Sequence, residues 1–284
     1  MPLLGAHMSV AGGLHRAFDH LRKINGEALQ IFTRNQRQWR AAPVSAAEAS
    51  SFRAAWQQAG RPPVASHDSY LINLASPKAE VAAKSVQALI DELERCATLG
   101  IPYVVMHPGA HLGSGIEQGI ALVAKNLDAA FAAASPAEEV MVLLENTAGQ
   151  GTTLGAGFAE LAGIIAASRH PARLGVCFDT CHAFAAGHDL RTPKAYAQTM
   201  AEFEAVIGLA RLRFFHLNDA IKGLGSRIDR HTHIGQGQIG LDGFRLLLND
   251  RRFKDHPMVL ETPKDEQLTE DIENLRTLRG LLRG

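Results

Sequence analysis

The residues best suited to chemistry in this sequence stand at the ends of short apolar runs. There are eight such runs, and seven of their eight end residues can bind a metal ion or move a proton. In chain order the end residues are His7, Phe32, His67, His107, Glu145, Asp179, His216 and Glu261. Imidazoles and carboxylates crowded into one place would repel one another or stay unsatisfied without bound cations. The pattern therefore predicts a metal cluster.

Three further candidate ligands lie close to these positions. His182 follows a run end by three residues, and the stretch DRHTHIGQG (229–237) adds Asp229 and His231, which face the same way from an extended backbone. With His7 set aside, the chain offers nine candidate ligands, which suits two or three ions with a position left open for water.

This ligand set indicates the metal and the reaction. Imidazoles and carboxylates without a thiolate quartet suit Zn²⁺, with Mn²⁺ or Fe²⁺ possible. A carboxylate such as Glu145 is the natural bridge between two ions because it has two oxygens. Multi-metal sites of this kind activate water and clamp phosphoryl oxygens, so we expect hydrolysis of a phosphate ester.

A regular alternation of strands and helices would bring these residues together. The expected strands cover 2–7, 28–32, 63–67, 103–107, 140–145, 173–179, 212–216 and 257–261. Helical periodicity marks Ser76 to Leu99 and Gly115 to Ala134, and Ser45 with Glu48 forms a capping-box pattern. Eight such alternations predict an α/β fold, a (β/α)8 TIM barrel whose active site lies at the C-terminal ends of the strands.

The same organisation predicts one domain over 1–284. An open doubly wound sheet is the main rival, but no G-x-G-x-x-G follows the first strand. The longest irregular segment, 217–241, is too long for an ordinary connection, which suggests a functional loop.

Composition limits the cellular setting and the partners. Lys plus Arg (29) balances Asp plus Glu (29), so a polyanion partner would need bound cations or a local basic patch. No membrane-spanning run or signal peptide is evident, and three cysteines do not make a disulfide framework. We expect a cytoplasmic protein without a membrane association, and no obligate protein partner is evident.

Several long motifs closely resemble the endonuclease IV family, the metal-dependent apurinic/apyrimidinic endonucleases of base excision repair. The motifs are ASHDSYLINLA (65–75), MHPGAH (106–111), LLENTAGQG (143–151), CFDTCHAFAAGHDL (177–190), HLNDAIKGLGSRIDRHTHIGQG (216–237) and LETP (260–263). Together with GAHMSVAGGL from residue 5, they extend the resemblance over nearly the whole chain.

The resemblance implies a trinuclear zinc site with its ligands divided into three groups. His67 and His107 would hold one ion, and Glu145 would bridge it to a second. The second ion would be completed by Asp179, His216 and Glu261. The third would be held by His182, Asp229 and His231.

The expected activity is cleavage of the phosphodiester 5′ to an abasic site in double-stranded DNA, giving a 3′-hydroxyl and a 5′-deoxyribose phosphate. A metal-bound hydroxide would attack the phosphorus, with Glu145 orienting or deprotonating it. We assign catalytic roles to Glu145 and Glu261. The resemblance also implies removal of blocking groups from 3′ ends.

Two loops are candidates for contact with DNA. The stretch TRNQRQWR (33–40) offers Arg34, Arg37 and Arg40 beside an aromatic side chain. Tyr70 and Leu71 follow the ligand His67, where an exposed pair could act as a wedge in the base stack. The resemblance to the endonuclease IV family implies that the side chains of Arg37, Tyr70 and Leu71 enter the DNA and help to flip the abasic nucleotide out.

Four residues near the candidate ligands are expected to have roles other than metal binding. His233 is expected to be a phosphate contact or an ordinary loop histidine, and His7 to hydrogen-bond near the cluster. Cys177 and Cys181 are interpreted as small packing residues, although a thiol near zinc could be oxidised.

Two alternative functions share part of this pattern. A divalent-metal sugar isomerase or epimerase on a similar barrel also places His, Glu and Asp at strand ends, but it needs fewer ligands. A non-enzymatic DNA-binding module would not call for nine of them.

Overall fold

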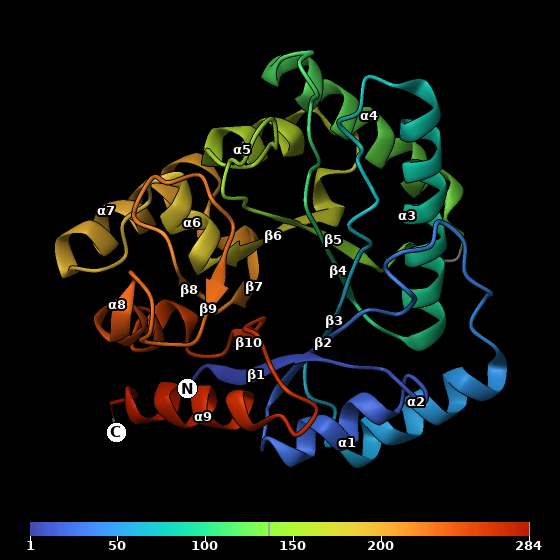
Figure 1. The fold of residues 1–284 in the computed structure, drawn as a ribbon. Coiled ribbons are helices and arrows are strands. Elements are labelled where there is room, and N and C mark those ends of the chain that lie inside the picture. Colours follow the sequence, from blue (N-terminus) through green and yellow to red (C-terminus); the bar gives the residue numbers. More distant parts are fainter. Residues whose placement is uncertain (136, 284) are drawn as a thin grey trace.

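The computed structural model describes residues 1–135 and 137–283, which form a closed eight-stranded barrel surrounded by helices (Figure 1). The barrel order is β1-β10-β7-β6-β5-β4-β3-β2, and the paired strands are parallel. Its strands are β1 (Leu3–Met8), β2 (Ala28–Ile31), β3 (Val64–His67), β4 (Tyr103–Met106), β5 (Met141–Glu145), β6 (Leu174–Asp179), β7 (Leu212–His216) and β10 (Pro257–Leu260). The predicted TIM barrel is confirmed.

The helices pack outside the barrel and follow the strands along the chain. They are α1 (Arg16–Lys23), α2 (Ala46–Gln58), α3 (Ala79–Leu99), α4 (Ile116–Ala133), α5 (Phe158–Ala167), α6 (Thr180–Ala186), α7 (Pro193–Val206), α8 (Gly240–Leu248) and α9 (Thr269–Gly280). Short 3-10 turns η1 (Pro171–Arg173), η2 (Leu209–Arg211) and η3 (Arg251–Phe253) precede β6, β7 and β10.

Local signals explain where the helices begin and end. The predicted capping box is present, since the Ser45 side chain accepts from the Glu48 N–H and the Glu48 carboxylate accepts from the Ser45 N–H. Helix α3 ends at Leu99 and is capped by Gly100, whose φ of 83° lies in the left-handed region that glycine tolerates.

Two apolar layers support the barrel. One fills its interior with seven buried side chains: Ala28, Ala65, Val105, Leu143, Cys177, Phe214 and Val259. The other lies between the strands and the helices and is far larger. Because side chains alternate along each strand, the interior positions nearest the C-terminal ends are free to hold polar groups over this apolar floor.

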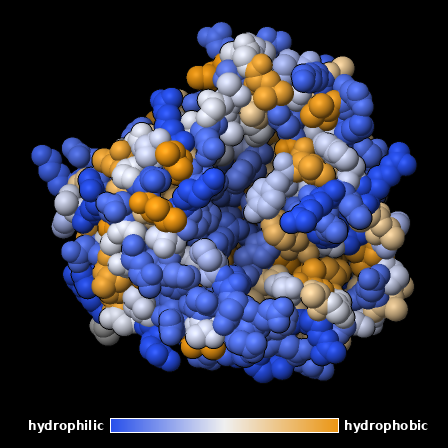
Figure 2. All heavy atoms as spheres, in the orientation of Figure 1, coloured by the Kyte–Doolittle hydropathy of each residue, from blue (hydrophilic) through white to orange (hydrophobic). Residues whose placement is uncertain are grey.

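Register places key residues side by side at the mouth. Asp179 on β6 is level with His216 on β7, and Glu145 on β5 is level with Cys177. Figure 2 shows a hydrophilic hollow in the centre of this view of the molecule.

The segment 217–241 is more ordered than the sequence suggested. It contains a two-stranded antiparallel ribbon of β8 (Asp219–Ala220) and β9 (His231–Thr232), with Ala220 opposite His231. Two-residue strands leave too short an alternation to be recognised from sequence. Among the described helices, none is both long and apolar enough to cross a bilayer.

Candidate metal centre

All nine predicted ligands converge at the C-terminal end of the barrel. Their donor atoms fall into groups whose members lie within 4.8 Å of one another. Three of these groups are His67, His107 and Glu145; Glu145, Asp179, His216 and Glu261; and His182, Asp229 and His231. These three groups match the division implied by the family resemblance, and a fourth group, of Asp179, Cys181 and His231, crosses it.

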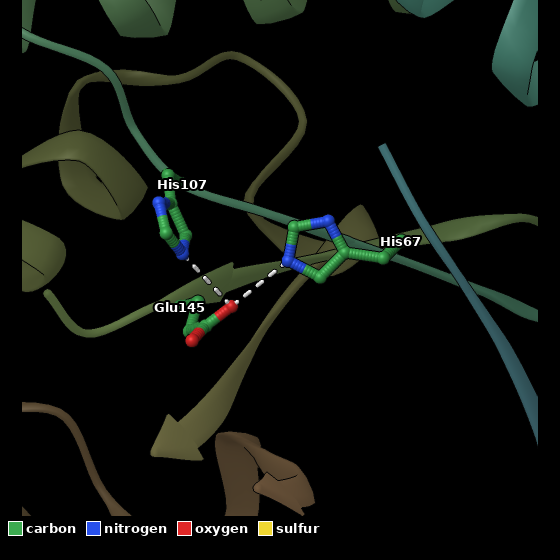
Figure 3. A group of neighbouring side chains, drawn as sticks. All are labelled: His67, His107 and Glu145. Carbon is green, nitrogen blue, oxygen red and sulfur yellow. Dashed lines mark hydrogen bonds and ion pairs between the residues drawn. The ribbon is translucent and has the colours of Figure 1, made fainter. Parts of the chain in front are cut away.

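Glu145 stands at the centre of the cluster and is fully buried. Its Oε2 lies 3.1 Å from Nε2 of His67 and 3.3 Å from Nε2 of His107 (Figure 3). Its Oε1 lies 3.2 Å from Nδ1 of His216 and 3.0 Å from Nδ1 of His182. The two carboxylate oxygens therefore face different sets of imidazoles, which is the arrangement a bridging ligand requires.

The second group surrounds His216 with carboxylates. Its Nδ1 lies 3.1 Å from Oε2 of Glu261 and 3.7 Å from Oδ2 of Asp179. Among the described residues, neither His216 Nδ1 nor Glu145 Oε1 has a hydrogen-bond partner, although both atoms are buried. Two unpartnered lone-pair atoms that face each other fit a shared cation.

The third group joins a short helix to the ribbon. His182 on α6 and His231 on β9 point their Nε2 atoms at each other across 3.4 Å. Asp229 supplies one oxygen to each imidazole, at 3.3 Å in both cases. The side chain of Asp229 is 43% exposed, so this part of the cluster opens to solvent.

In four of the five candidate imidazole ligands, one ring nitrogen, here called the rear nitrogen, faces a hydrogen-bond acceptor of the supporting structure. The rear Nδ1 atoms of His67, His182 and His231 lie 2.9, 3.0 and 3.4 Å from backbone carbonyl oxygens of Asp68, Asn146 and Glu261. The rear Nε2 of His216 lies 2.8 Å from the side-chain oxygen of Gln30. A rear N–H that donates to an acceptor leaves the front nitrogen unprotonated, as metal-binding histidines require. The donor set thus fits divalent cations.

The charges of the cluster are strongly coupled. Burial acts to lower the pKa of His67, but the hydrogen bond and charge of Glu145 prevail and raise it to about 10. Burial acts to raise the pKa of Glu145, but the charges of His216 and His107 hold it well below its usual range. Without a cation, His67 would therefore carry a proton that offsets the charge of Glu145, and metal binding would displace that proton.

The predicted DNA-contacting residues flank this mouth. Tyr70 is 65% exposed, and its ring centroid lies 5.6 Å from that of His67 and 6.3 Å from that of His107. Tyr70 and both histidines border a cleft of about 190 Å³. Leu71 is half-buried beside Tyr70, and Arg37 is exposed.

The arginines of loop 33–40 have different surroundings. Arg34 is buried, donates to the carbonyls of Trp39 and Ala88, and lies 3.4 Å from Glu92. It is therefore unavailable to a substrate, and its inclusion among the loop arginines offered to DNA was wrong. The carboxylate that pairs with Arg34 is buried on α3, far along the chain, so the sequence around Arg34 could not reveal the pairing.

The remaining residues near the cluster occupy supporting positions. His7 lies behind Glu261, 3.5 Å from its Oε1, and His233 pairs with Asn274; neither belongs to a described ligand group. Cys177 packs in the barrel interior. Cys181 is buried, with its thiol 3.7 Å from the carbonyl oxygen of Arg230, yet it also groups with Asp179 and His231.

Sequence reasoning missed two amides that hold the ligands. Asn218 donates to Asp179 Oδ2 (2.6 Å) and accepts from the Glu261 N–H (2.9 Å). Gln30 contacts both His216 and Glu261. A signal existed in both cases: Asn218 stands two residues after a strand-end ligand, and Gln30 is a polar residue inside an otherwise apolar strand.

Comparisons with known proteins agree on one family. A model of the family described as "Xylose isomerase-like TIM barrel" matches residues 18–279. A Chloroflexus aurantiacus protein named "Probable endonuclease 4" is 52% identical over 100% of this chain and 99% of its own length. The crystal structure of endonuclease IV from Thermus thermophilus superposes with a TM-score of 0.88 at 39% identity, covering 99% of this chain and 98% of that one.

One further solved structure is similar in fold alone. A D-tagatose 3-epimerase-like protein superposes with a TM-score of 0.75 at 19% identity, covering 98% of this chain and 96% of that one. The barrel is thus shared with sugar epimerases, and the function has to be argued from the site.

Proposed function

This chain belongs to the endonuclease IV family, and on that premise we propose that it incises double-stranded DNA 5′ to abasic sites, leaving a 3′-hydroxyl and a 5′-deoxyribose phosphate. Removal of blocking groups from 3′ ends is part of the same proposal. The observation that best supports it is Glu145, whose two oxygens face separate sets of imidazoles while Oε1 has no hydrogen-bond partner among the described residues. The two relatives named as endonucleases, at 52% and 39% sequence identity, support a nuclease and count against the sugar isomerase alternative.

We further propose three zinc ions, with Mn²⁺ or Fe²⁺ able to substitute, held by the three groups of side chains. His67, His107 and Glu145 would hold the first, and Glu145 would share the second with Asp179, His216 and Glu261. His182, Asp229 and His231 would hold the third. Bound divalent ions would lower the pKa of water and offset the charge of the phosphate oxygens, which is the chemistry that phosphodiester hydrolysis needs.

The chain's own groups would position the reactants. Glu145 would orient or deprotonate the attacking water, because its carboxylate is fully buried and lies between the first two groups of ligands. Glu261 presents Oε2 to His216 while its Oε1 accepts from Gln30 at 2.6 Å. The buried apolar floor below excludes bulk water from this side of the reaction.

Selectivity would come from the rim of the cleft. Tyr70, with Leu71 beside it, projects from the loop that follows β3, so it can enter the base stack next to the cluster. Exposed Arg37 can contact a phosphate. A nucleotide without its base costs less to unstack, so abasic sites would be favoured with little sequence preference.

Incision of a duplex that carries one tetrahydrofuran, a stable abasic analogue, tests the proposal. The assay would be run before and after prolonged chelation, with metal content measured on the same sample. Cleavage 5′ to the lesion that is lost with zinc and restored by its return is expected. A fully loaded protein that leaves the duplex intact would overturn the assignment and direct the search to sugar substrates.

A further inference from the structure

Gln30 is a fully buried amide on β2, at a barrel position that points inward above Ala28. Its Nε2 donates to Glu261 Oε1 at 2.6 Å and lies 3.0 Å from Nδ1 of His7. Its Oε1 lies 2.8 Å from Nε2 of His216. A single neutral side chain therefore touches two of the nine candidate ligands from below.

The orientation of this amide follows from its partners. An ionised carboxylate can only accept, so the Gln30 NH₂ group has to face Glu261. The Gln30 oxygen then faces His216, and the hydrogen bond requires that His216 carry its proton on Nε2. The Nδ1 lone pair of His216 is thereby directed at the cluster, 3.1 Å from Glu261 Oε2 and 3.2 Å from Glu145 Oε1.

The acceptor behind His216 is a side chain, whereas the acceptors behind the other supported imidazoles belong to the backbone. His67, His182 and His231 rest on backbone carbonyls, which substitution cannot remove. Of the imidazoles held from behind in the described chain, His216 alone rests on a side chain. The single Nδ1 atom of His216 also lies within 3.7 Å of three carboxylates, so an error in its orientation would misplace the centre of the second group.

We propose that Gln30 is a positioning residue of the metal centre, which sets the tautomer of His216 and fixes the orientation of Glu261 relative to it. The inference rests on the proposed metal-dependent function. It goes beyond the ligand set because Gln30 contacts no metal itself and acts only through two side chains that would.

Zinc affinity of the stripped and reloaded full-length protein tests the role directly. Gln30→Met keeps a similar length and removes both hydrogen bonds. Loss of such outer partners typically weakens metal binding by about 10- to 100-fold, and we expect that fall in competition with a chromogenic chelator. Asn249→Leu is the matched control, because Asn249 is also an amide that donates to two carbonyls, at 2.8 and 2.9 Å, but lies outside the metal centre.

A spectroscopic readout separates the tautomer from a general packing defect. In the Co²⁺-loaded protein, an imidazole N–H next to the ion gives a shifted proton resonance that exchanges slowly while its acceptor is in place. Gln30→Glu keeps an oxygen facing His216, whereas Gln30→Met offers none. We expect the His216 resonance to stay protected in Gln30→Glu and to exchange rapidly in Gln30→Met.

The outcomes are distinguishable. An unchanged protected resonance in Gln30→Met, or a zinc affinity within about twofold of wild type, would overturn the role of Gln30. A wild-type protein that binds no zinc would instead overturn the proposed function. Should Gln30→Met fail to fold in thermal unfolding of the stripped protein, Gln30→Asn replaces it, because its amide is one methylene too short to reach both partners.

Discussion

Two buried carboxylates lie on the same face of the barrel in opposite situations. Asp219 accepts hydrogen bonds from the backbone N–H groups of Gly235, Gly237 and Ile239, at 2.9, 3.1 and 2.9 Å. Glu145 faces four imidazoles, and its Oε1 has no hydrogen-bond partner in the described part of the chain. Both side chains are fully buried.

The difference shows how a structural carboxylate can be told from a functional one. Backbone donors around Asp219 satisfy its charge and hold the loop that leads from β9 to α8 in one conformation. The carboxylate oxygens of Glu145 instead face imidazole nitrogens of other candidate ligands. An unsatisfied buried charge lowers stability, so its persistence indicates that something else binds there.

The largest effect is expected from Glu145→Gln, which keeps the shape and removes the charge at the centre of the cluster. An amide cannot bridge two cations, so kcat for incision should fall about 10³-fold or more, and the metal content should fall with it. Steady-state kinetics and elemental analysis on one preparation would measure both. Glu139→Gln, an exposed change before the same strand, serves as control. Full metal content with normal kcat would contradict the bridging role.

A smaller effect is expected from Asp229→Ala, because Asp229 belongs to the most exposed of the three groups. The protein should lose about one ion per chain and retain the other two groups, with a fall of about 10²-fold in kcat. Titration of the stripped variant with zinc would count the remaining sites. Asp255→Ala, whose side chain is 79% exposed, should bind metal as wild type does. Loss of all metal would show that the groups are not separable.

Much of this architecture could be predicted because strands and their ends are local features. The apolar runs located every barrel strand to within one or two residues, and the barrel fold then placed His67, Glu145 and His216 at one mouth. Three of the four groups of donor atoms among the described residues match the division that the family resemblance implied.

The rest depended on contacts between distant parts of the chain. Arg34 is paired with a carboxylate on α3, 58 positions later in the sequence, and no local pattern reveals that partner. Asp219 stands three residues after the strand-end ligand His216, so its sequence position is as suggestive of a ligand as that of His182 after Asp179. Only the backbone donors around it show that it is structural.

Asp219→Asn should have a moderate effect on activity through the loop alone. The amide replaces an acceptor with a donor that faces backbone N–H groups, so His231 should be held less firmly, and kcat should fall roughly 10-fold. Gly237 packs against Asp219 so closely that an added Cβ would lie 2.5 Å from Oδ1, which leaves the loop little room to adjust. The control is Asp250→Asn, a nearly buried carboxylate before β10. Equal kinetics in both variants would refute an anchoring role.

The smallest effect on activity is expected at a carboxylate that is fully hydrogen-bonded and lies far from the mouth of the barrel. Asp128 on α4 accepts from the Ser168 hydroxyl (2.7 Å) and from the Arg169 backbone N–H (3.0 Å) and side chain (3.0 Å). Burial acts to raise its pKa, but these hydrogen bonds prevail and hold it below the usual value. Asp128→Asn should lower the free energy of unfolding by about 1 kcal/mol at pH 7 without changing kcat.

The pH dependence of that loss follows from the direction of the shift. Because the folded pKa is depressed, the stabilisation is present above the ordinary carboxyl pKa of about 4 and disappears as the pH falls through the folded value. Denaturant unfolding of both proteins should therefore converge in acid. Arg169→Ala should cost less than Asp128→Asn, since the arginine side chain is 75% exposed and Ser168 and the backbone remain. If the free energies of unfolding of Asp128→Asn and wild type still differ in acid, the stabilisation comes from packing. Asp128 would then not be a carboxylate that stabilises the fold through its hydrogen-bonded charge, as Asp219 does.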